Sequence, residues 1–461
     1  MRTAVVLLNR DLRVHDHPAL AAACAQAERV LPLFVFDDAM LAGLHRAQNR
    51  VAFLLDSLRC LRAELRRRGG DLVVRRGDAV GETVRIARQV AAEAVLCSED
   101  VSGYAQRRAA ALTSDLKRCR VELRLHPGIT VVPPGELRPA GGSHYRVFTP
   151  YWRAWQAATW RPLAAAPPRL RLPEGVDAGE CPALTALLPH GPATSAGLQT
   201  GGEQAGRARM RAWTAGPVTA QEDRHDDLAA DATAKLSAYL HFGCLSPLEF
   251  ALAAGDGPDA QAACAQAPGP QAPGAQAPGA AALRRQLAWR DFHHQVTAAF
   301  PQITTQDYRP RGIGWHEDTD AFAAWCEGRT GIPIVDAGLR QLRHEGWMHN
   351  RARLITAALL TKKLRIDWRL GARHFMDWLA DGDIANNYGN WQWVAGTGND
   401  TRPNRGFNPL RQARRFDPQG SYVRRWVPEL AALAGPLVHE PWRLPAATRR
   451  DLGYPDPTRR P

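Results

Sequence analysis

Short apolar runs alternate with helical patterns over the first 132 residues, and this alternation constrains the fold more than any other feature of the chain. The runs that read as buried strands are residues 3–8, Val30–Phe36, Leu72–Arg75, Ala94–Cys97 and Val121–Leu125. Helical patterns lie between them, over Pro18–Ala27, Asn49–Leu65 and Tyr104–Leu116. Because buried strands that alternate with helices form parallel sheets, we predict a doubly wound α/β domain over residues 1–132.

The rest of the chain divides into a connector and a helical region. Pro133-Pro134 opens a long connection, and residues 162–202 are rich in Pro, Gly and Thr without periodicity. We therefore predict an interdomain connector over residues 133–205, partly mobile and with a short aromatic helix over Phe148–Trp160. Residues 206–461 carry helical patterns and predict a second, predominantly α domain. Its expected helices are Leu228–Leu240, Leu283–Phe300, Asp320–Glu327, Ile334–Glu345, Asn350–Leu364 and Ala372–Leu379.

A low-complexity stretch interrupts the helical region at about residues 255–282. The tetrapeptide Gln-Ala-Pro-Gly stands at 266–269, 271–274 and 276–279. A repeat of this composition has too few apolar side chains to build a core. We therefore expect a disordered surface insertion here.

Charge and cysteine usage limit the classes of function. The net charge of +13 favours a polyanionic partner, nucleic acid before an anionic membrane, although an Arg-rich composition also arises in a GC-rich genome. The eight cysteines form no C-x-x-C pair, which argues against structural zinc and against a disulfide framework. No apolar run reaches the ~18 residues of a membrane span, and the N-terminal run is too short for a signal peptide. We expect a cytoplasmic protein with no metal site and no membrane partner.

The densest polar and aromatic stretch is Asp381–Trp393, where carboxylates, amides and two tryptophans stand close together. Its Asp-Gly-Asp and Asn-Asn sequences favour a turn, since Asx side chains bond their own backbone. Polar groups beside large rings suit a planar ligand rich in heteroatoms. A surface loop whose tryptophans pack on a core is the alternative, and this stretch alone leaves both readings open. The usual dinucleotide and P-loop glycine motifs are not found in the sequence.

Motifs spread along the chain resemble those of the photolyase/cryptochrome family. They are Arg10-Asp11-Leu12-Arg13-Val14-His15-Asp16, Trp289-Arg290-Asp291-Phe292, Thr330–Ala337, Gly346–Arg353 and Arg415-Phe416-Asp417-Pro418. The resemblance covers nearly the whole chain and is greatest for class I photolyases of cyclobutane pyrimidine dimers. It implies an N-terminal antenna domain and a helical FAD-binding and catalytic domain.

The resemblance also implies which residues hold FAD. Thr233–Ser237 corresponds to the turn that binds the diphosphate, Arg353 would pair with Asp381 beside the flavin, and Asn387 would face flavin N5. The implied cofactor-binding residues are Gln221, Thr233, Ala234, Lys235, Leu236, Ser237, Arg290, Arg353, Asp381, Gly382, Asp383 and Asn387.

The implied activity is light-driven DNA repair, in which photoexcited reduced FAD passes an electron to a flipped-out pyrimidine dimer and the dimer splits. Trp391, Trp368 and Trp315 resemble the family's electron-transfer relay, which serves the flavin together with Asn387. The implied substrate-binding residues are Gln286, Trp289, Asn350, Arg351, Trp393, Arg405 and Gln412. The expected partner is UV-damaged DNA, bound by a monomer.

Two subtypes of the family are disfavoured. Asn350 and Leu354 stand where (6-4) photolyases tend to place histidines, and Asn387 favours a photolyase over a cryptochrome. Two alternatives stay open: a photolyase-like cryptochrome acting as a blue-light receptor, and a nucleic-acid-binding protein without flavin.

Several positions depart from the usual photolyase pattern. Gln221 replaces a Tyr, Ala234-Lys235 replaces Ser-Arg, and Gln286 replaces a Glu. Because Lys is a point charge where Arg binds in a bidentate way, the changes at Gln221, Ala234 and Lys235 are expected to weaken FAD binding. Gln286 can still donate and accept hydrogen bonds, so dimer recognition is expected to persist with an altered pH dependence. Tyr104 and Thr305 stand where folate-binding members carry Glu and Lys. That favours 8-hydroxy-5-deazaflavin, or no antenna, over methenyltetrahydrofolate.

Overall fold

The computed structural model describes residues 1–461 except 44–45, 216–225, 255–277, 403–405 and 458–461. The chain forms two compact units. The α/β unit contains Met1–Pro192, Thr200–Thr219 and Ala234–Gln302. The helical unit contains Ala193–Gln199, Ala220–Thr233 and Ile303–Pro461.

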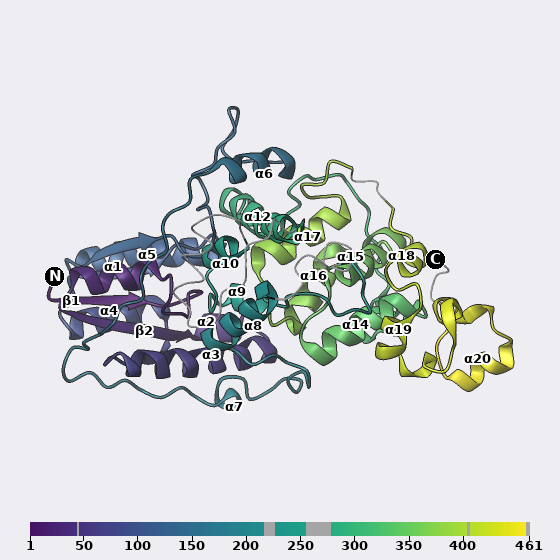
Figure 1. The fold of residues 1–461 in the computed structure, drawn as a ribbon, viewed down its shortest axis with the longest axis horizontal. Coiled ribbons are helices and arrows are strands. Elements are labelled where there is room, and N and C mark those ends of the chain that lie inside the picture. The colour runs from purple at the N-terminus through teal and green to yellow at the C-terminus, as the bar shows by residue number, and fades with distance from the viewer. Residues whose placement is uncertain (44–45, 216–225, 255–277, 403–405, 458–461) are drawn as a thin grey trace. The chain divides into compact units, whose positions relative to one another are not determined.

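A five-stranded sheet is the centre of the α/β unit (Figure 1), and its strand order is β3-β2-β1-β4-β5. Every neighbouring pair is parallel, with registers such as Val5 opposite Leu31 and Val5 opposite Val95. The strands are β1 (Thr3–Leu7), β2 (Arg29–Asp37), β3 (Val73–Gly77), β4 (Ala94–Ser98) and β5 (Glu122–His126). The predicted doubly wound α/β class is confirmed, and each predicted strand is found close to its predicted bounds.

Helices cover the sheet and explain why its central strands read as continuous apolar runs. The side chains of Val5, Leu33 and Val95 share one buried cluster with residues of α4 and α5, while α1 packs against β1 and β4. Strands buried on both faces need apolar residues at successive positions. The helices that accompany the sheet are α1 (Pro18–Gln26), α2 (Asp38–Ala42), α3 (Gln48–Arg67), α4 (Ala79–Gln89) and α5 (Gly103–Arg118).

The predicted connector contains short helices and backbone contacts to the sheet. Val30 and Val74 donate backbone hydrogen bonds to the carbonyls of Arg171 and Ala178, both at 2.8 Å. The edge strand β3 is therefore partly covered by this segment. The helices of the α/β unit beyond β5 are α6 (Phe148–Ala157), α7 (Leu184–Leu187), α8 (Glu203–Ala215), α9 (Ser237–His241), α10 (Pro247–Ala253) and α12 (Pro278–Ala299).

Asp291 joins α12 to the segment that follows the sheet. Its Oδ2 accepts hydrogen bonds from the backbone N–H groups of Val131 and Val132, at 3.0 and 3.1 Å, and from Trp155 Nε1 at 3.0 Å. Asp291 is 1% exposed, and burial raises the pKa of its carboxyl group to about 6. A buried carboxylate that accepts three hydrogen bonds fixes α6 and α12 side by side (Figure 1).

The helical unit consists of helices in the part that the structure describes. Its α-helices are α13 (Thr319–Glu327), α14 (Pro333–Glu345), α15 (Asn350–Ala358), α16 (Trp368–Trp378), α17 (Ile384–Ala395), α18 (Pro409–Phe416), α19 (Ser421–Trp426) and α20 (Ala446–Leu452). The π-helix η2 (Leu359–Lys363) and three 3₁₀ turns, η3 (Pro428–Leu430), η4 (Gly435–His439) and η5 (Pro441–Arg443), complete it. Among the described helices, none combines the length and the apolar character that crossing a membrane requires.

The predicted helix over Leu228–Leu240 is wrong for most of its length. Only Ser237–His241 is helical. Asp227 Oδ1 accepts hydrogen bonds from the backbone N–H groups of Ala229 and Ala230, which is an Asx turn. Asp231 and Lys235 then adopt positive φ, of 46° and 44°. Side-chain hydrogen bonds to the backbone outweigh the helix propensity of the alanines here.

Three other expectations need correction. Asn386-Asn387 lies inside α17 rather than in a turn, because Asp383 caps that helix. The predicted helix over Asn350–Leu364 passes into the π-helix η2 at Leu359. The expected insertion lies mostly outside the described residues, and its last residues, from Pro278, belong to α12.

The raised pKa of Asp291 predicts a pH-dependent contribution to stability. An unfolded Asp has a pKa of about 3.9, so between about pH 4 and 6 the folded chain holds a proton that the unfolded chain has lost. The contribution of this group to the free energy of unfolding therefore falls as the pH rises through that range. Lowering the pH from 7 to 5 should stabilise the parent protein relative to Asp291→Asn by about 1 kcal/mol, as measured by urea unfolding. If the difference in the free energy of unfolding between the parent and Asp291→Asn did not change with pH, the raised pKa of Asp291 would be refuted.

Candidate functional site

The first turn of α17 is built by Asp383. Its Oδ1 accepts hydrogen bonds from the backbone N–H and the side-chain Nδ2 of Asn386, at 2.8 and 2.7 Å. Such a cap satisfies N–H groups that a helix start leaves open. Since residues four apart share a helix face, Asn387 and Trp391 then project from the same side of α17.

Arg353 and Asp381 form an ion pair directly before that helix. Arg353 Nη2 lies 2.8 Å from Asp381 Oδ2, and Arg353 Nε donates to the carbonyl of Met348 at 2.8 Å. The Asp381 side chain is only 4% exposed. Its second oxygen, Oδ1, is buried and accepts no hydrogen bond within the described residues. The site thus contains a buried Asp381 carboxylate whose Oδ1 can still accept a hydrogen bond.

Asn387 and Trp391 tie α17 to α16. The Asn387 side chain is buried, and its Nδ2 donates to the carbonyl of Ala372 at 3.0 Å. Trp391 lies against Gly371, where an added Cβ would come within 2.2 Å of the ring. Glycine at this position therefore permits the indole ring to touch the backbone of α16.

Trp368 is fully buried, but its indole ring has polar neighbours. Its Nε1 donates to Asp307 Oδ1 at 3.0 Å, and Arg369 donates to the same oxygen at 2.7 Å. The Arg369 guanidinium carbon also lies 4.7 Å from the centre of the Trp368 ring. Trp368 contacts Tyr388 edge to face, with ring centres 6.2 Å apart.

The three tryptophans of the expected relay do not form one continuous stack. In the part of the chain that the structure describes, Trp391 makes ring contacts with Phe375 and Trp325, and none with Trp368. The link between them runs through Gly371 and Tyr388, each three residues from one of the two tryptophans. Trp315 is half-buried, and the next residue pairs with Arg365 through a backbone hydrogen bond of 2.7 Å.

The expected diphosphate turn has one unpartnered hydroxyl and one guanidinium beside it. Thr233 Oγ1 is buried and makes no hydrogen bond with the described residues. Within the α/β unit, Arg209 Nε donates to the carbonyl of Ala234 at 2.6 Å. Lys235 has positive φ, Leu236 is buried, and Ser237 begins α9.

In the α/β unit, Trp289 stacks on Phe148. The two ring centres are 3.7 Å apart and the rings are nearly parallel, at 6°. Gln286 is exposed on the same helix, α12. Arg290 Nη1 donates to the carbonyl of Ile129 at 2.6 Å. Aromatic packing of this kind holds a tryptophan rigidly, which suits either a core or a stacking platform.

The other expected substrate-binding residues belong to the helical unit. Asn350 is exposed at the start of α15, Trp393 contacts Phe407 with ring centres 6.4 Å apart, and Gln412 is half-buried on α18. Arg351 pairs with Asp226 in the same unit. Gln221 and Arg405 lie outside the described residues. Gly382 follows Asp381 in the turn before α17.

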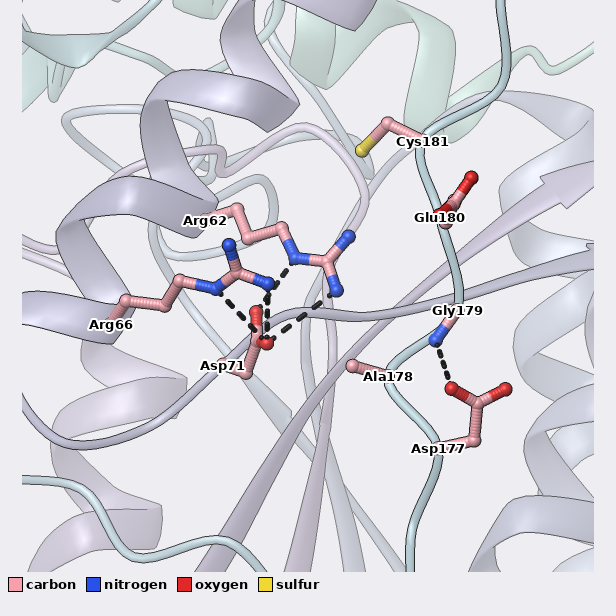
Figure 2. Close-up of a pocket in the computed structure, with 8 residues that line it drawn as sticks. All are labelled: Arg62, Arg66, Asp71, Asp177, Ala178, Gly179, Glu180 and Cys181. Atoms are coloured by element: carbon pink, nitrogen blue, oxygen red, sulfur yellow. Dashed lines mark hydrogen bonds and ion pairs between the residues drawn. The ribbon is translucent and has the colours of Figure 1, made fainter.

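A polar hollow beside the sheet is a separate feature (Figure 2). It is lined by Arg62, Arg66, Asp71, Asp177, Ala178, Gly179, Glu180 and Cys181. Arg62 and Arg66 both pair with Asp71, so the carboxylate already compensates charge there. Among the described residues, none of those expected to bind flavin or DNA lines this hollow.

Arg209, Asp226 and Asp307 are partners of site residues that were not predicted from the sequence. Each contacts a residue far away in the chain, at separations of 25, 125 and 61 residues. The sequence does show a cluster of acidic residues at Asp226, Asp227 and Asp231. That cluster does not indicate which basic residue each carboxylate contacts.

Comparison with known proteins agrees with this architecture. Residues 4–169 match the family described as DNA photolyase, and residues 283–459 match the FAD binding domain of DNA photolyase. The chain is 48% identical to the deoxyribodipyrimidine photo-lyase of Streptomyces griseus, over 99% of this chain and 96% of that protein. It is 35% identical to a cryptochrome DASH of Natronomonas pharaonis, over 99% of this chain and 98% of that protein.

Among solved structures, a bacterial class III photolyase from Agrobacterium tumefaciens superposes with a TM-score of 0.89 at 32% identity. The match covers 99% of this chain and 94% of that one. The chain therefore belongs to the photolyase/cryptochrome family. Residues 283–459 correspond to the family's FAD-binding domain.

The contact between Gly371 and Trp391 can be tested by Gly371→Ala. Alanine gains up to about 1 kcal/mol of helix propensity, but overpacking a core costs about 1–3 kcal/mol, so we expect a net loss of about 1 kcal/mol in the free energy of unfolding. Gly314→Ala is the control, because nothing lies within 4 Å of its added Cβ. Equal stability of the two variants would contradict this close packing.

Proposed function

We propose that this chain is a deoxyribodipyrimidine photo-lyase, an enzyme that uses light to split cyclobutane pyrimidine dimers in DNA. The observation that carries the proposal is the likeness, over nearly the full length of both chains, to a protein of that name. The geometry supports it, because the described site offers hydrogen-bonding groups and aromatic rings. No acid, base or nucleophile is needed to break the cyclobutane ring after one-electron reduction.

The residues of the helical unit fit FAD. Asp381 Oδ1 and Thr233 Oγ1 are buried and lack hydrogen-bond partners within the described residues. Burying such atoms is costly unless a ligand completes them. Asp381, held by Arg353, would accept from a flavin N–H, while Thr233 would meet the diphosphate. When bound and reduced, FAD supplies the photoexcited electron that opens the cyclobutane ring.

Other residues of the chain would complete the cofactor site. The Asn387 amide, fixed by its bond to Ala372, would face flavin N5. Asp383 and Gly382 would lie along the polar edge of the flavin. The remaining proposed contacts are Gln221, Ala234, Lys235, Leu236, Ser237 and Arg290. Arg209 is held at the carbonyl of Ala234 and brings a guanidinium to a turn that lacks the arginine usual in the family.

Trp391, Trp368 and Trp315 are proposed as a three-step relay between the flavin and the protein surface, which serves the photoreduction of oxidised FAD. The contact of the Trp391 ring with the α16 backbone and the contact of Trp368 with Tyr388 support a path between the first two. Asp307 would stabilise positive charge on Trp368, because its carboxylate accepts the indole N–H.

The substrate would be a dimer extruded from the duplex, at a cost of a few kcal/mol that is smallest for a damaged pair. Stacking on Trp289 and Trp393 would offset part of this cost, and Gln286 and Asn350 would bond the base edges. Arg351, Arg405 and Gln412 would contact the DNA backbone, which positions the protein without reading sequence.

Finer points also belong to this proposal. Tyr104 donates a hydrogen bond to Asp37 and stands where folate-binding members carry a Glu. We therefore favour 8-hydroxy-5-deazaflavin, or no antenna, over methenyltetrahydrofolate. A monomer in the cytoplasm is proposed. The runner-up function is a photolyase-like cryptochrome, favoured by the likeness to a cryptochrome DASH.

The proposed function is tested by illuminating the purified protein with dimer-containing oligothymidylate under reducing conditions. We expect flavin absorption bands and a recovery of thymine absorbance that requires blue light. Flavin bands without recovery would favour the receptor, and a colourless protein would exclude the flavin-dependent reading.

Trp391→Phe tests the relay separately from repair. The variant should lose photoreduction of bound oxidised FAD, because phenylalanine is much harder to oxidise than tryptophan. Chemically reduced variant should still repair dimers. Trp347→Phe is the matched control, since Trp347 has no proposed role in the relay. Photoreduction at the parent rate in Trp391→Phe would remove Trp391 from the relay.

A further inference from the structure

Arg351, one of the residues proposed to contact DNA, already has an anionic partner. Its Nη2 donates to both carboxylate oxygens of Asp226, at 2.8 and 2.7 Å, and its Nε lies 3.3 Å from Oδ1. The guanidinium carbon also lies 4.4 Å from the centre of the Phe416 ring. The ion pair and the ring together hold the guanidinium in one place at the start of α15.

The segment that carries Asp226 is fixed in the helical unit. Leu228 N donates to the carbonyl of Phe416 at 2.9 Å, and Asp227 caps the turn that follows. Farther along, Asp231 lies 4.0 Å from Arg425. The segment thus places the carboxylates of Asp226 and Asp231 against Arg351 and Arg425, respectively.

Both members of the main pair remain accessible to solvent. The Arg351 side chain is 23% exposed and the Asp226 side chain is 29% exposed. A phosphate could therefore approach Arg351, but it would have to compete with the carboxylate for the same nitrogen atoms. Carboxylate and phosphate both match the fork of a guanidinium, so each can replace the other.

We propose that Asp226 is a built-in competitor for DNA phosphate at Arg351 and thereby lowers the affinity of the protein for undamaged duplex. The inference rests on the proposed contact of Arg351 with DNA. An undamaged duplex is held by backbone contacts alone, so each arginine that is neutralised internally removes part of that binding. The Asp226 carboxylate keeps Arg351 in position and weakens the electrostatic attraction between Arg351 and a DNA phosphate.

Asp226→Asn tests this inference because it removes the charge and keeps the size of the side chain. Binding to an undamaged duplex should tighten about threefold or more at low salt. The plot of log K against log salt should steepen by about 0.9, the increment for one extra phosphate contact on B-DNA. Fluorescence anisotropy with a labelled duplex between about 50 and 200 mM salt measures both quantities.

Two further variants separate competition from other causes. Glu317→Gln removes one exposed carboxylate elsewhere in the same unit and should change neither quantity measurably. In an Arg351→Gln background, Asp226→Asn should have no effect, since the group for which the two anions compete is gone.

Four results would overturn the inference: unchanged binding by Asp226→Asn, weaker binding by Asp226→Asn, an equal gain in Glu317→Gln, or a gain that persists without Arg351. Weaker binding would make Asp226 a support that DNA binding needs. The light-driven assay is independent of this test. If the parent protein splits dimers but Asp226→Asn does not bind undamaged duplex more tightly, this inference alone is removed. If Asp226→Asn binds more tightly but the parent protein does not split dimers, the proposed function alone is removed.

Discussion

The ion pair between Arg353 and Asp381 is the interaction on which the rest of the candidate site in the helical unit depends. It joins α15 to the turn before α17. Asp383 then caps the helix, and Asn387 and Trp391 follow at one-turn intervals. A buried pair of this kind adds little net stability, but removing one partner leaves an uncompensated charge in the interior. The pair therefore matters for geometry more than for the free energy of unfolding.

Carboxylates hold side chains that are proposed to be functional at several points of this chain. Asp381 holds Arg353, Asp307 accepts the indole N–H of Trp368, and Asp226 holds Arg351. The two arginines are long side chains that would otherwise sample many rotamers, and the carboxylates order them. The entropic cost of ordering is met on folding, before a ligand arrives. A strongly basic protein thus uses its acidic residues to position its cationic and aromatic ones.

The sequence predicted the sheet well, because strands buried on both faces must be continuously apolar and such runs are easy to recognise. It failed over Leu228–Leu240, where the Asx turn at Asp227 overrides the helix propensity of alanine. It also misread Asn386-Asn387, since turn chemistry and helix capping use the same residue types and only Asp383 decides between them.

The candidate site followed from motifs rather than from local pattern. The positions of Arg353 and Asp381 were expected from the resemblance to a family, and the structure pairs them. Asp226 and Asp307 could not be found in this way, because their partners are 125 and 61 residues distant. Contacts of that range depend on how helices pack, which no local pattern of residues specifies.

The stack of Trp289 on Phe148 lets the connector help to orient a tryptophan that is proposed to bind the dimer. Phe148 begins α6, just after a segment rich in Pro and Gly, and its ring lies 3.7 Å from that of Trp289. Arg285 lies over the same phenylalanine ring, 5.4 Å from its centre. The orientation of the tryptophan is thus set partly from outside its own helix. Insertions or deletions between residues 133 and 147 would therefore shift Phe148 and tilt the Trp289 ring, although they lie in a linker where such changes are usually neutral.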